Sequence, residues 1–266
     1  MGWNRGPGIF WGVLLVLVGV LFLLGNTGVL NNVNWDVVWP VILIALGLWL
    51  IAARFGPGGS PADVDSSEVR DGLARARLEV AVGAARLSVR SAPLGDQLYH
   101  VHLGHLGARP EIRLDRATGT LRISQPFGWF QGAGRLRVEA ELSDAIPWDV
   151  SCSTGSIRGD FELAGGTVTG FDCKTGESHI DLRLPAPKGP VPVRLEGGAV
   201  TIDLTRPAGS AVKVQVTGGA VRLTADGSRQ DGLGSREWRS SGYDAAQDRY
   251  DVNVSGGAAR VTVAEA

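Results

Sequence analysis

Two cysteines are the first residues whose positions suggest chemistry. Cys152 and Cys173 are the only cysteines in the chain, and they occupy equivalent positions in successive copies of the repeat described below. Neighbouring thiols of this kind form a disulfide or hold a metal ion. The equivalent positions in other copies hold valine and leucine, which favours the interpretation that both cysteines pack as small core side chains.

Three histidines form a second candidate. The segment HVHLGH contains His100, His102 and His105. On a strand, His100 and His102 point to the same face, as paired metal ligands would. No carboxylate or cysteine lies close in sequence to complete a site, so an exposed strand face or turn is the favoured interpretation and a metal site the weak alternative.

No catalytic motif accompanies these residues. The sequence contains no GxxxxGK[ST], no GxGxxG between a strand and a helix, no GxSxG and no HExxH. Asp172, Lys174 and Glu177 surround one glycine, where surface charges are normal for a turn. The net charge is −1, which gives the chain as a whole no basic footprint for nucleic acid. We therefore expect no catalytic residue, no cofactor and no enzymatic activity.

A repeat must position the cysteines. EGGAVTIDL (196–204), TGGAVRLTA (217–225) and SGGAARVTV (255–263) are copies of one unit, and segments 82–89, 154–161 and 175–182 fit the same template. The copies align on six glycines, namely Gly83, Gly155, Gly176, Gly198, Gly219 and Gly257. The positions three and five before each glycine are apolar, and the predicted repeat core is Val150, Cys152, Phe171, Cys173, Val193, Leu195, Val214, Val216, Val252 and Val254.

Each unit is predicted to be two β arms joined at a glycine corner. Apolar and polar residues alternate within each arm, as in a strand with one buried face. The alternation breaks across the glycine, a residue suited to a corner because it accepts positive φ. A unit of about 21 residues cannot bury its own apolar face, so copies must stack. We predict an all-β repeat domain, either a β-solenoid or a repetitive two-layer β structure.

Two segments depart from the repeat. Residues 226–245 interrupt the period before the last copy and are interpreted as an inserted loop. Residues 112–124 (IRLDRATGTLRIS) are expected to form a hairpin that turns at Thr118–Gly119.

The N-terminus carries two uncharged apolar stretches, residues 9–24 and 37–53. They predict a two-helix transmembrane hairpin over 1–54, with spans at about 8–28 and 35–53. Tryptophans gather near the ends of both stretches, as at a membrane interface. Arg5 precedes the first span, Arg54 follows the second, and the connecting loop has no Lys or Arg. The positive-inside rule therefore predicts that both termini lie in the cytoplasm of the cell.

A change of composition separates this hairpin from the repeat. Residues 55–72 are dominated by Gly, Pro, Ser and Asp without apolar periodicity, so we expect a flexible linker there. The β-repeat domain is then expected to span 73–266.

The first 55 residues resemble the LiaI/LiaF-like transmembrane region of bacterial envelope-stress proteins. The resemblance rests on GWNRGPGIFWGVLLVLVGVLFLLGNTGVL and WDVVWPVILIALGLWLI, above all on the Gly-Asn-Thr-Gly turn and the Trp-Pro pair of the second stretch. The GG-A-V-x-I-x-L units look like the toast-rack or adhesin-type β domains fused to such anchors.

The resemblance implies a membrane-anchored, non-catalytic regulatory or scaffold protein of the response to cell-wall-active antibiotics. Its expected partners are the lipid bilayer and a membrane protein such as a sensor histidine kinase. The alternative is an extracytoplasmic adhesin or cell-wall-binding module. Open sheet ends can pair edge to edge, so self-association is a further expectation.

Overall fold

The structure is a computed structural model that describes residue 44 and residues 62–105, 110–125 and 136–266. The chain divides into two compact units, Met1–Gly56 and Pro57–Ala266. Apart from Ile44, which is helical, the two expected spans lie outside the described residues. Among the residues that are described, no helix is both long enough and apolar enough to cross a membrane.

The second unit is nearly all β-structure. Its strands join in one mixed twelve-stranded sheet of spatial order β1-β3-β6-β2-β7-β8-β9-β12-β10-β11, with β5 beside β2 and β4 beside β5. The strands are β1 (Ala62–Val69), β2 (Ala76–Ala92), β3 (Gln97–His105), β4 (Glu111–Asp115), β5 (Thr120–Ser124), β6 (Leu136–Ser143), β7 (Pro147–Glu162), β8 (Thr167–Arg183), β9 (Pro190–Arg206), β10 (Ala211–Ala225), β11 (Ser228–Arg239) and β12 (Arg249–Glu265), with the 3-10 helix η1 (Tyr243–Ala245) before β12.

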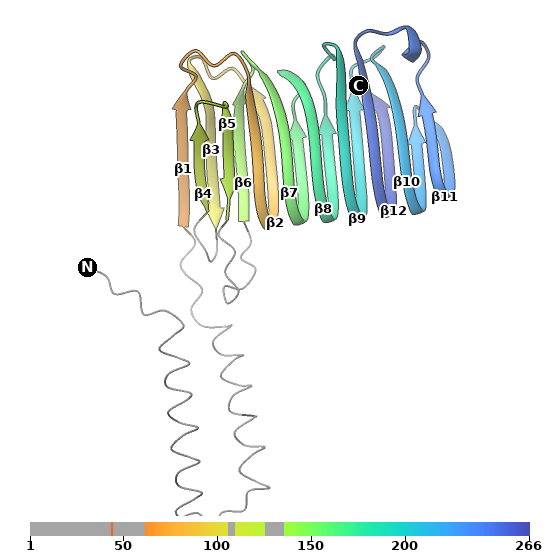
Figure 1. The fold of residues 1–266 in the computed structure, drawn as a ribbon, viewed down its shortest axis with the longest axis horizontal. Helices are drawn as coiled ribbons and strands as arrows, with labels where there is room; N and C mark the ends of the chain where they lie inside the picture. The colour runs from red at the N-terminus through yellow and green to blue at the C-terminus, as the bar shows by residue number, and fades with distance from the viewer. Residues whose placement is uncertain (1–43, 45–61, 106–109, 126–135) are drawn as a thin grey trace, which may run out of the picture. The chain divides into compact units, whose positions relative to one another are not determined.

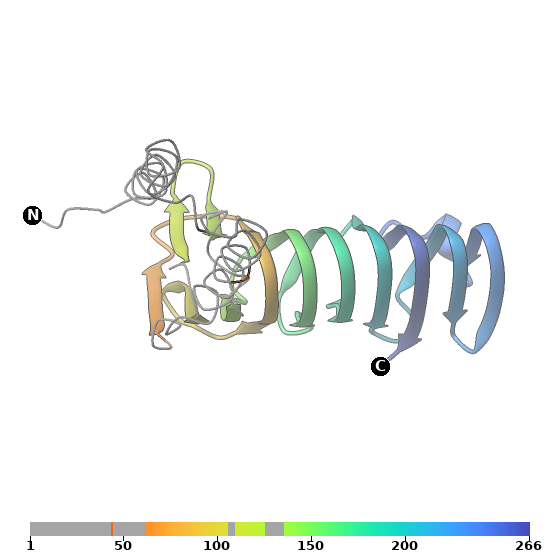
Figure 2. The same ribbon diagram turned by 90° about the horizontal axis from the view of Figure 1, so that it is seen from below.

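The six strands that carry the repeat are long and run parallel in register. Figure 1 shows β2, β7, β8, β9, β12 and β10 side by side, and Figure 2 shows that each of them arches over. The pairing between neighbouring strands skips the aligned glycine of each strand, and the alternation of buried and exposed residues shifts there. The sheet is thus doubled over along this row of glycines, which we call the corner row, and each strand has a first arm before its glycine and a second arm after it.

Apolar side chains from both arms fill the interior of the doubled sheet. All ten residues of the predicted repeat core are at most 2% exposed. They belong to one continuous hydrophobic cluster that extends over the whole described β unit. The repeat therefore builds a shared core, as stacking of units that cannot fold alone requires.

One copy shows how the core adapts to a missing side chain. Gly159 stands where the neighbouring copies have leucine and isoleucine. A Cβ at Gly159 would lie 2.5 Å from the ring of Phe161. That ring also packs edge-on against Phe171, with centroids 5.0 Å apart. The aromatic ring fills the space that a larger residue at this position occupies in other strands.

Close packing accounts for the corner glycines other than Gly83, and an unusual backbone accounts for none of them. None of the six has positive φ, so the expected conformational reason is wrong. A Cβ at Gly176 would lie 2.6 Å from the carbonyl oxygen of Gly155, and one at Gly155 would lie 2.8 Å from that of Gly83. The same approach continues through Gly198, Gly257 and Gly219. In these five strands a side chain at the glycine would collide with the backbone of the neighbouring strand, whereas a Cβ at Gly83 would meet nothing within 4 Å.

The C-terminal strand is inserted between two strands that precede it. β12 pairs in parallel with β9 on one side and with β10 on the other. Residues 226–245, expected to be an inserted loop, instead contain η1 and strand β11, which pairs antiparallel with β10 at the end of the sheet. The repeat period is interrupted because the chain forms this terminal strand before it returns to fill the gap.

A buried arginine holds the inserted strand in place. Arg206 is 1% exposed and lies at the end of β9. Its guanidinium forms ion pairs with Asp226, directly after β10, and with Glu265 of β12, and it donates to the carbonyl of Ser210 at 2.8 Å. The hydrogen bond from Arg206 also lowers the pKa of the Glu265 carboxyl. One side chain therefore joins the ends of three adjacent strands.

The N-terminal part of the sheet differs from the expectation for residues 55–72. Ala62–Val69 form strand β1, which pairs antiparallel with β3, so the flexible linker is wrong for this part and the sheet already includes Ala62, before position 73. The hairpin expected over 112–124 is confirmed, because β4 and β5 pair antiparallel on either side of Thr118–Gly119.

Candidate functional site

The structure separates the three histidines of β3. His100 and His102 lie on the outer face, whereas His105 is buried at 8% exposure on the other face. Nδ1 of His102 lies 2.7 Å from Asp65 of β1, and this hydrogen bond raises the pKa of the His102 imidazole. Nδ1 of His100 lies 3.5 Å from Glu141. Each exposed ring thus has its own carboxylate, and the three rings do not converge on one point.

The two cysteines are neighbours in the core. Cys152 and Cys173 are in-register partners on β7 and β8, each is 1% exposed, and both are free thiols. Contact with Cys173, together with burial, raises the pKa of the Cys152 thiol well above its usual range. A thiol held in its neutral form in an apolar interior is a poor nucleophile and a poor metal ligand. The geometry is that of two small core side chains.

The charged residues around Gly176 lie on both arms of β8, on either side of the bend. Asp172 and Lys174 lie on the first arm of β8, and Glu177 begins its second arm. Nζ of Lys174 lies 3.3 Å from Glu196 of β9 in an exposed ion pair. An exposed pair of this kind contributes little to stability, and the three charges form no common site.

A different set of potential metal ligands comes together on the second arms. The ligand atoms of His179, Asp181 and Asp203 all lie within 4.8 Å of one another. Asp181 and Asp203 are in-register partners on β8 and β9, since both stand five residues after a corner glycine. The alignment of the repeat therefore contained the signal for this cluster. Arg158 is in register with His179, which places a positive charge beside any cation bound there.

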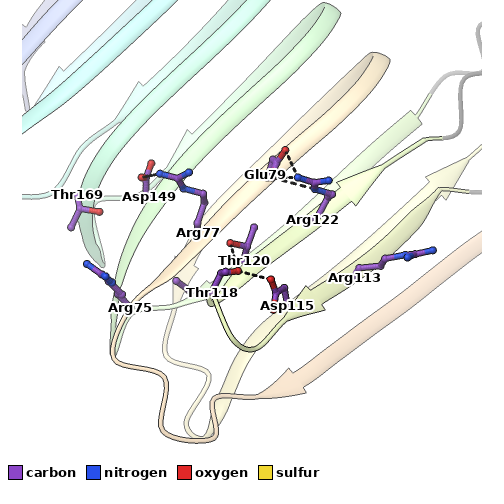
Figure 3. Close-up of a pocket in the computed structure, with 11 residues that line it drawn as sticks. Arg75, Arg77, Glu79, Arg113, Asp115, Thr118, Thr120, Arg122, Asp149 and Thr169 are labelled. Atoms are coloured by element: carbon purple, nitrogen blue, oxygen red, sulfur yellow. Dashed lines mark hydrogen bonds and ion pairs between the residues drawn. The ribbon is translucent and has the colours of Figure 1, made fainter.

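The outer face of the first arms is hollowed beside the β4–β5 hairpin. The hollow has a volume of about 770 Å³ and is lined by residues of β2, β4, β5 and β7. Figure 3 shows Arg77 reaching toward Asp149, at 2.7 Å, and Arg122 toward Glu79, at 2.9 Å. Because these charges already have partners, this hollow offers a ligand few free groups.

A second hollow, of about 830 Å³, lies on the outer face of the second arms. Arg86 of β2, Arg137 of β6 and Arg158 of β7 line it. Arg86 is the in-register partner of both other arginines, so the three guanidinium groups extend from adjacent strands in one row. We call these three residues the arginine row. Sequence reasoning missed it because Arg137 lies outside the repeat.

The apolar N-terminal stretch is the part of the chain that matches a known protein family. Residues 9–51 match the family model described as the LiaI-LiaF-like transmembrane region. The chain therefore carries a LiaI-LiaF-like transmembrane region. This region anchors the chain in a membrane, and the resemblance expected from the sequence is confirmed. No curated protein is similar enough in sequence to match the chain.

The β unit resembles solved structures. A candidate cell adhesion protein from Clostridium sporogenes has 18% sequence identity and a TM-score of 0.63, over 78% of this chain and 100% of that one. At that identity the likeness shows the fold alone. A candidate adhesin from Bacteroides fragilis has 8% identity and a TM-score of 0.24, over 78% of this chain and 99% of the other.

Proposed function

We propose that the chain is a membrane-anchored, non-catalytic regulatory or scaffold protein of a bacterial cell-envelope stress response, and that it acts by contact with other proteins. The observation that carries the proposal is the LiaI-LiaF-like transmembrane region at residues 9–51. In this proposal, two helices form the anchor and both termini lie in the cytoplasm. The positions of Arg5 and Arg54 on either side of the apolar stretches support that orientation.

The edges of the sheet are the proposed contact surface. Val69 on β1 and Leu233 on β11 are the large exposed apolar side chains of the described β unit, at 54% and 75% exposure. β1 and β11 are the outermost strands of the sheet order. Edge strands offer unpaired backbone N–H and C=O groups, which a partner strand can bind. A sensor histidine kinase or another membrane protein is the proposed partner.

Co-purification tests the proposal. The full chain is expected to retain a membrane sensor kinase after mild detergent extraction from cells treated with a cell-wall-active antibiotic. Leu233→Glu is expected to reduce the retained kinase, whereas Ser153→Glu, an exposed position on a first arm, leaves it unchanged. If Leu233→Glu retains as much kinase as the unchanged chain, or if the full chain retains no membrane protein, the proposal is contradicted.

An extracytoplasmic adhesin or wall-binding module is the second candidate, favoured by the fold shared with the Clostridium sporogenes protein. A reporter fused after Ala266 separates the two candidates. Activity of a cytoplasmic reporter supports the regulatory protein. Activity of a reporter that functions only outside the cytoplasm reverses the orientation and supports the adhesin.

A further inference from the structure

The arginine row places like charges side by side. Arg137, Arg86 and Arg158 are exposed and lie on adjacent parallel strands, whose backbones are about 4.8 Å apart. Like charges directly opposite one another destabilise a sheet. The row therefore lowers the stability of the sheet unless a bound anion neutralises its charge.

The arginines of the row have no carboxylate partner, unlike several arginines elsewhere on the sheet. Within the part of the chain that the structure describes, Arg86, Arg137 and Arg158 form no ion pair. On the outer face of the first arms, Arg77 and Arg122 are each paired with a carboxylate. The free guanidinium groups line one hollow, which has the size of a small-ligand site.

His105 borders the same hollow, but its side chain lies on the inner face of β3 and its Nδ1 is buried without a hydrogen-bond partner. A ligand in the hollow would therefore meet the guanidinium groups of the outer face and not this imidazole nitrogen.

Carboxylates limit the size of the anion that fits. Asp63, Glu139 and Glu177 also line the hollow, and none of them forms an ion pair with the arginine row. Glu139 follows Arg137 by two residues on the same face of β6. A long polyanion laid over the row would meet these negative charges, whereas one compact anionic group can contact the guanidinium groups alone.

We propose that this hollow binds a single phosphate group. Guanidinium forks match the oxygens of phosphate and donate paired hydrogen bonds to them. The group is held by Arg86, Arg137 and Arg158. A free phosphate, a soluble phosphate ester and the headgroup of an anionic phospholipid share this chemistry. The site is independent of the proposed function, since either a stress-response scaffold or an adhesin could contain it.

Titration of the full chain in maltoside micelles, which contain no phosphate, tests the site. Calorimetry with inorganic phosphate and with a short-chain phosphatidylglycerol is expected to detect binding of at least one of them. Arg86→Gln and Arg158→Gln are each expected to weaken binding about tenfold or more, because each removes a charged hydrogen-bond donor. Arg260→Gln is the matched control, since Arg260 has the same position relative to its glycine on β12 but does not line the hollow.

The two ligands distinguish the source of the phosphate. Tighter binding of phosphatidylglycerol supports a lipid headgroup, and tighter binding of inorganic phosphate supports a free anion. Absence of binding by both ligands at about 10 mM overturns the proposal, because a useful site holds its ligand more tightly. Equal weakening by Arg260→Gln and Arg86→Gln also overturns it, since it would show a general effect of surface charge. Unchanged circular dichroism of both arginine variants excludes unfolding as the cause.

Discussion

Replacing Gly176 by alanine tests the close approach of strands at the corner row. The new Cβ would lie 2.6 Å from the carbonyl oxygen of Gly155, an atom of the backbone that cannot rotate away. Strands β7 and β8 must then separate at the bend. Gly83→Ala is the matched control, because Gly83 has the same place in its strand but a Cβ there meets nothing within 4 Å.

Two opposing effects set the magnitude. An extra methyl group forced into a packed site typically costs about 1–3 kcal/mol. Alanine also restricts the unfolded chain, which stabilises the fold by about 0.4–1 kcal/mol where the backbone accepts it. Gly176→Ala should therefore lower the free energy of unfolding by about 1–2 kcal/mol. Gly83→Ala should leave it unchanged or raise it by up to about 1 kcal/mol.

Urea unfolding of the full chain in micelles, followed by the β-sheet signal in circular dichroism, measures the difference. With a dependence on urea of about 2 kcal/mol per molar, the two midpoints should differ by about 1 M. Equal midpoints, or a lower midpoint for Gly83→Ala, would refute the argument that backbone contact is the reason for glycine. A changed urea dependence would instead indicate that the unfolding is no longer two-state.

Three further predictions concern other parts of the sheet. Cys152→Val should change the free energy of unfolding by less than about 1.5 kcal/mol. Cys152→Ser should lower it by about 1–3 kcal/mol, because only serine buries an unpaired hydroxyl. Thermal unfolding measures both. Asp65→Asn should lower the pKa of His102 toward 6.5 in an NMR titration, since the hydrogen bond from Asp65 is the main cause of its rise; an unchanged pKa would contradict that assignment. The Glu265 carboxyl has a depressed pKa, so its stabilising effect is present above the unfolded pKa near 4.5 and is lost as the pH falls through the folded pKa. Glu265→Gln should therefore make the melting temperature less sensitive to acid. An identical dependence of the melting temperature on pH would argue against the ion pair with Arg206.

The sequence alone predicted the units and their core, because both depend on local alternation. The positions of Cys152, Val193 and Val254 relative to their glycines determine which face they present, and that relation needs no knowledge of the fold. The in-register contact of Asp181 with Asp203 follows from the same alignment, although it becomes a cluster only once β8 and β9 are known to be adjacent.

The order of the strands could not be predicted in this way. Copies of one unit are nearly equivalent pairing partners, so the pattern does not distinguish β10 from β12 as the neighbour of β9. Strand β1 was missed because ADVDSSEV has few residues typical of strands, and it depends on pairing with β3. The hollow with the arginine row needed both β6 and β3, which lie outside the repeat.

The insertion of β12 has a consequence for synthesis on the ribosome. β10 leaves the exit tunnel before β12, and both strands carry the same pattern of buried residues around their glycines, the pattern with which β12 pairs with β9. Residues 207–210, which link β9 to β10, are as few as residues 163–166, which link the direct neighbours β7 and β8. We expect a nascent chain to pair β10 with β9 first and to exchange that pairing once β12 emerges. Crosslinking of stalled chains between β9 and β10 should detect this early pairing, and its absence at every length would exclude it.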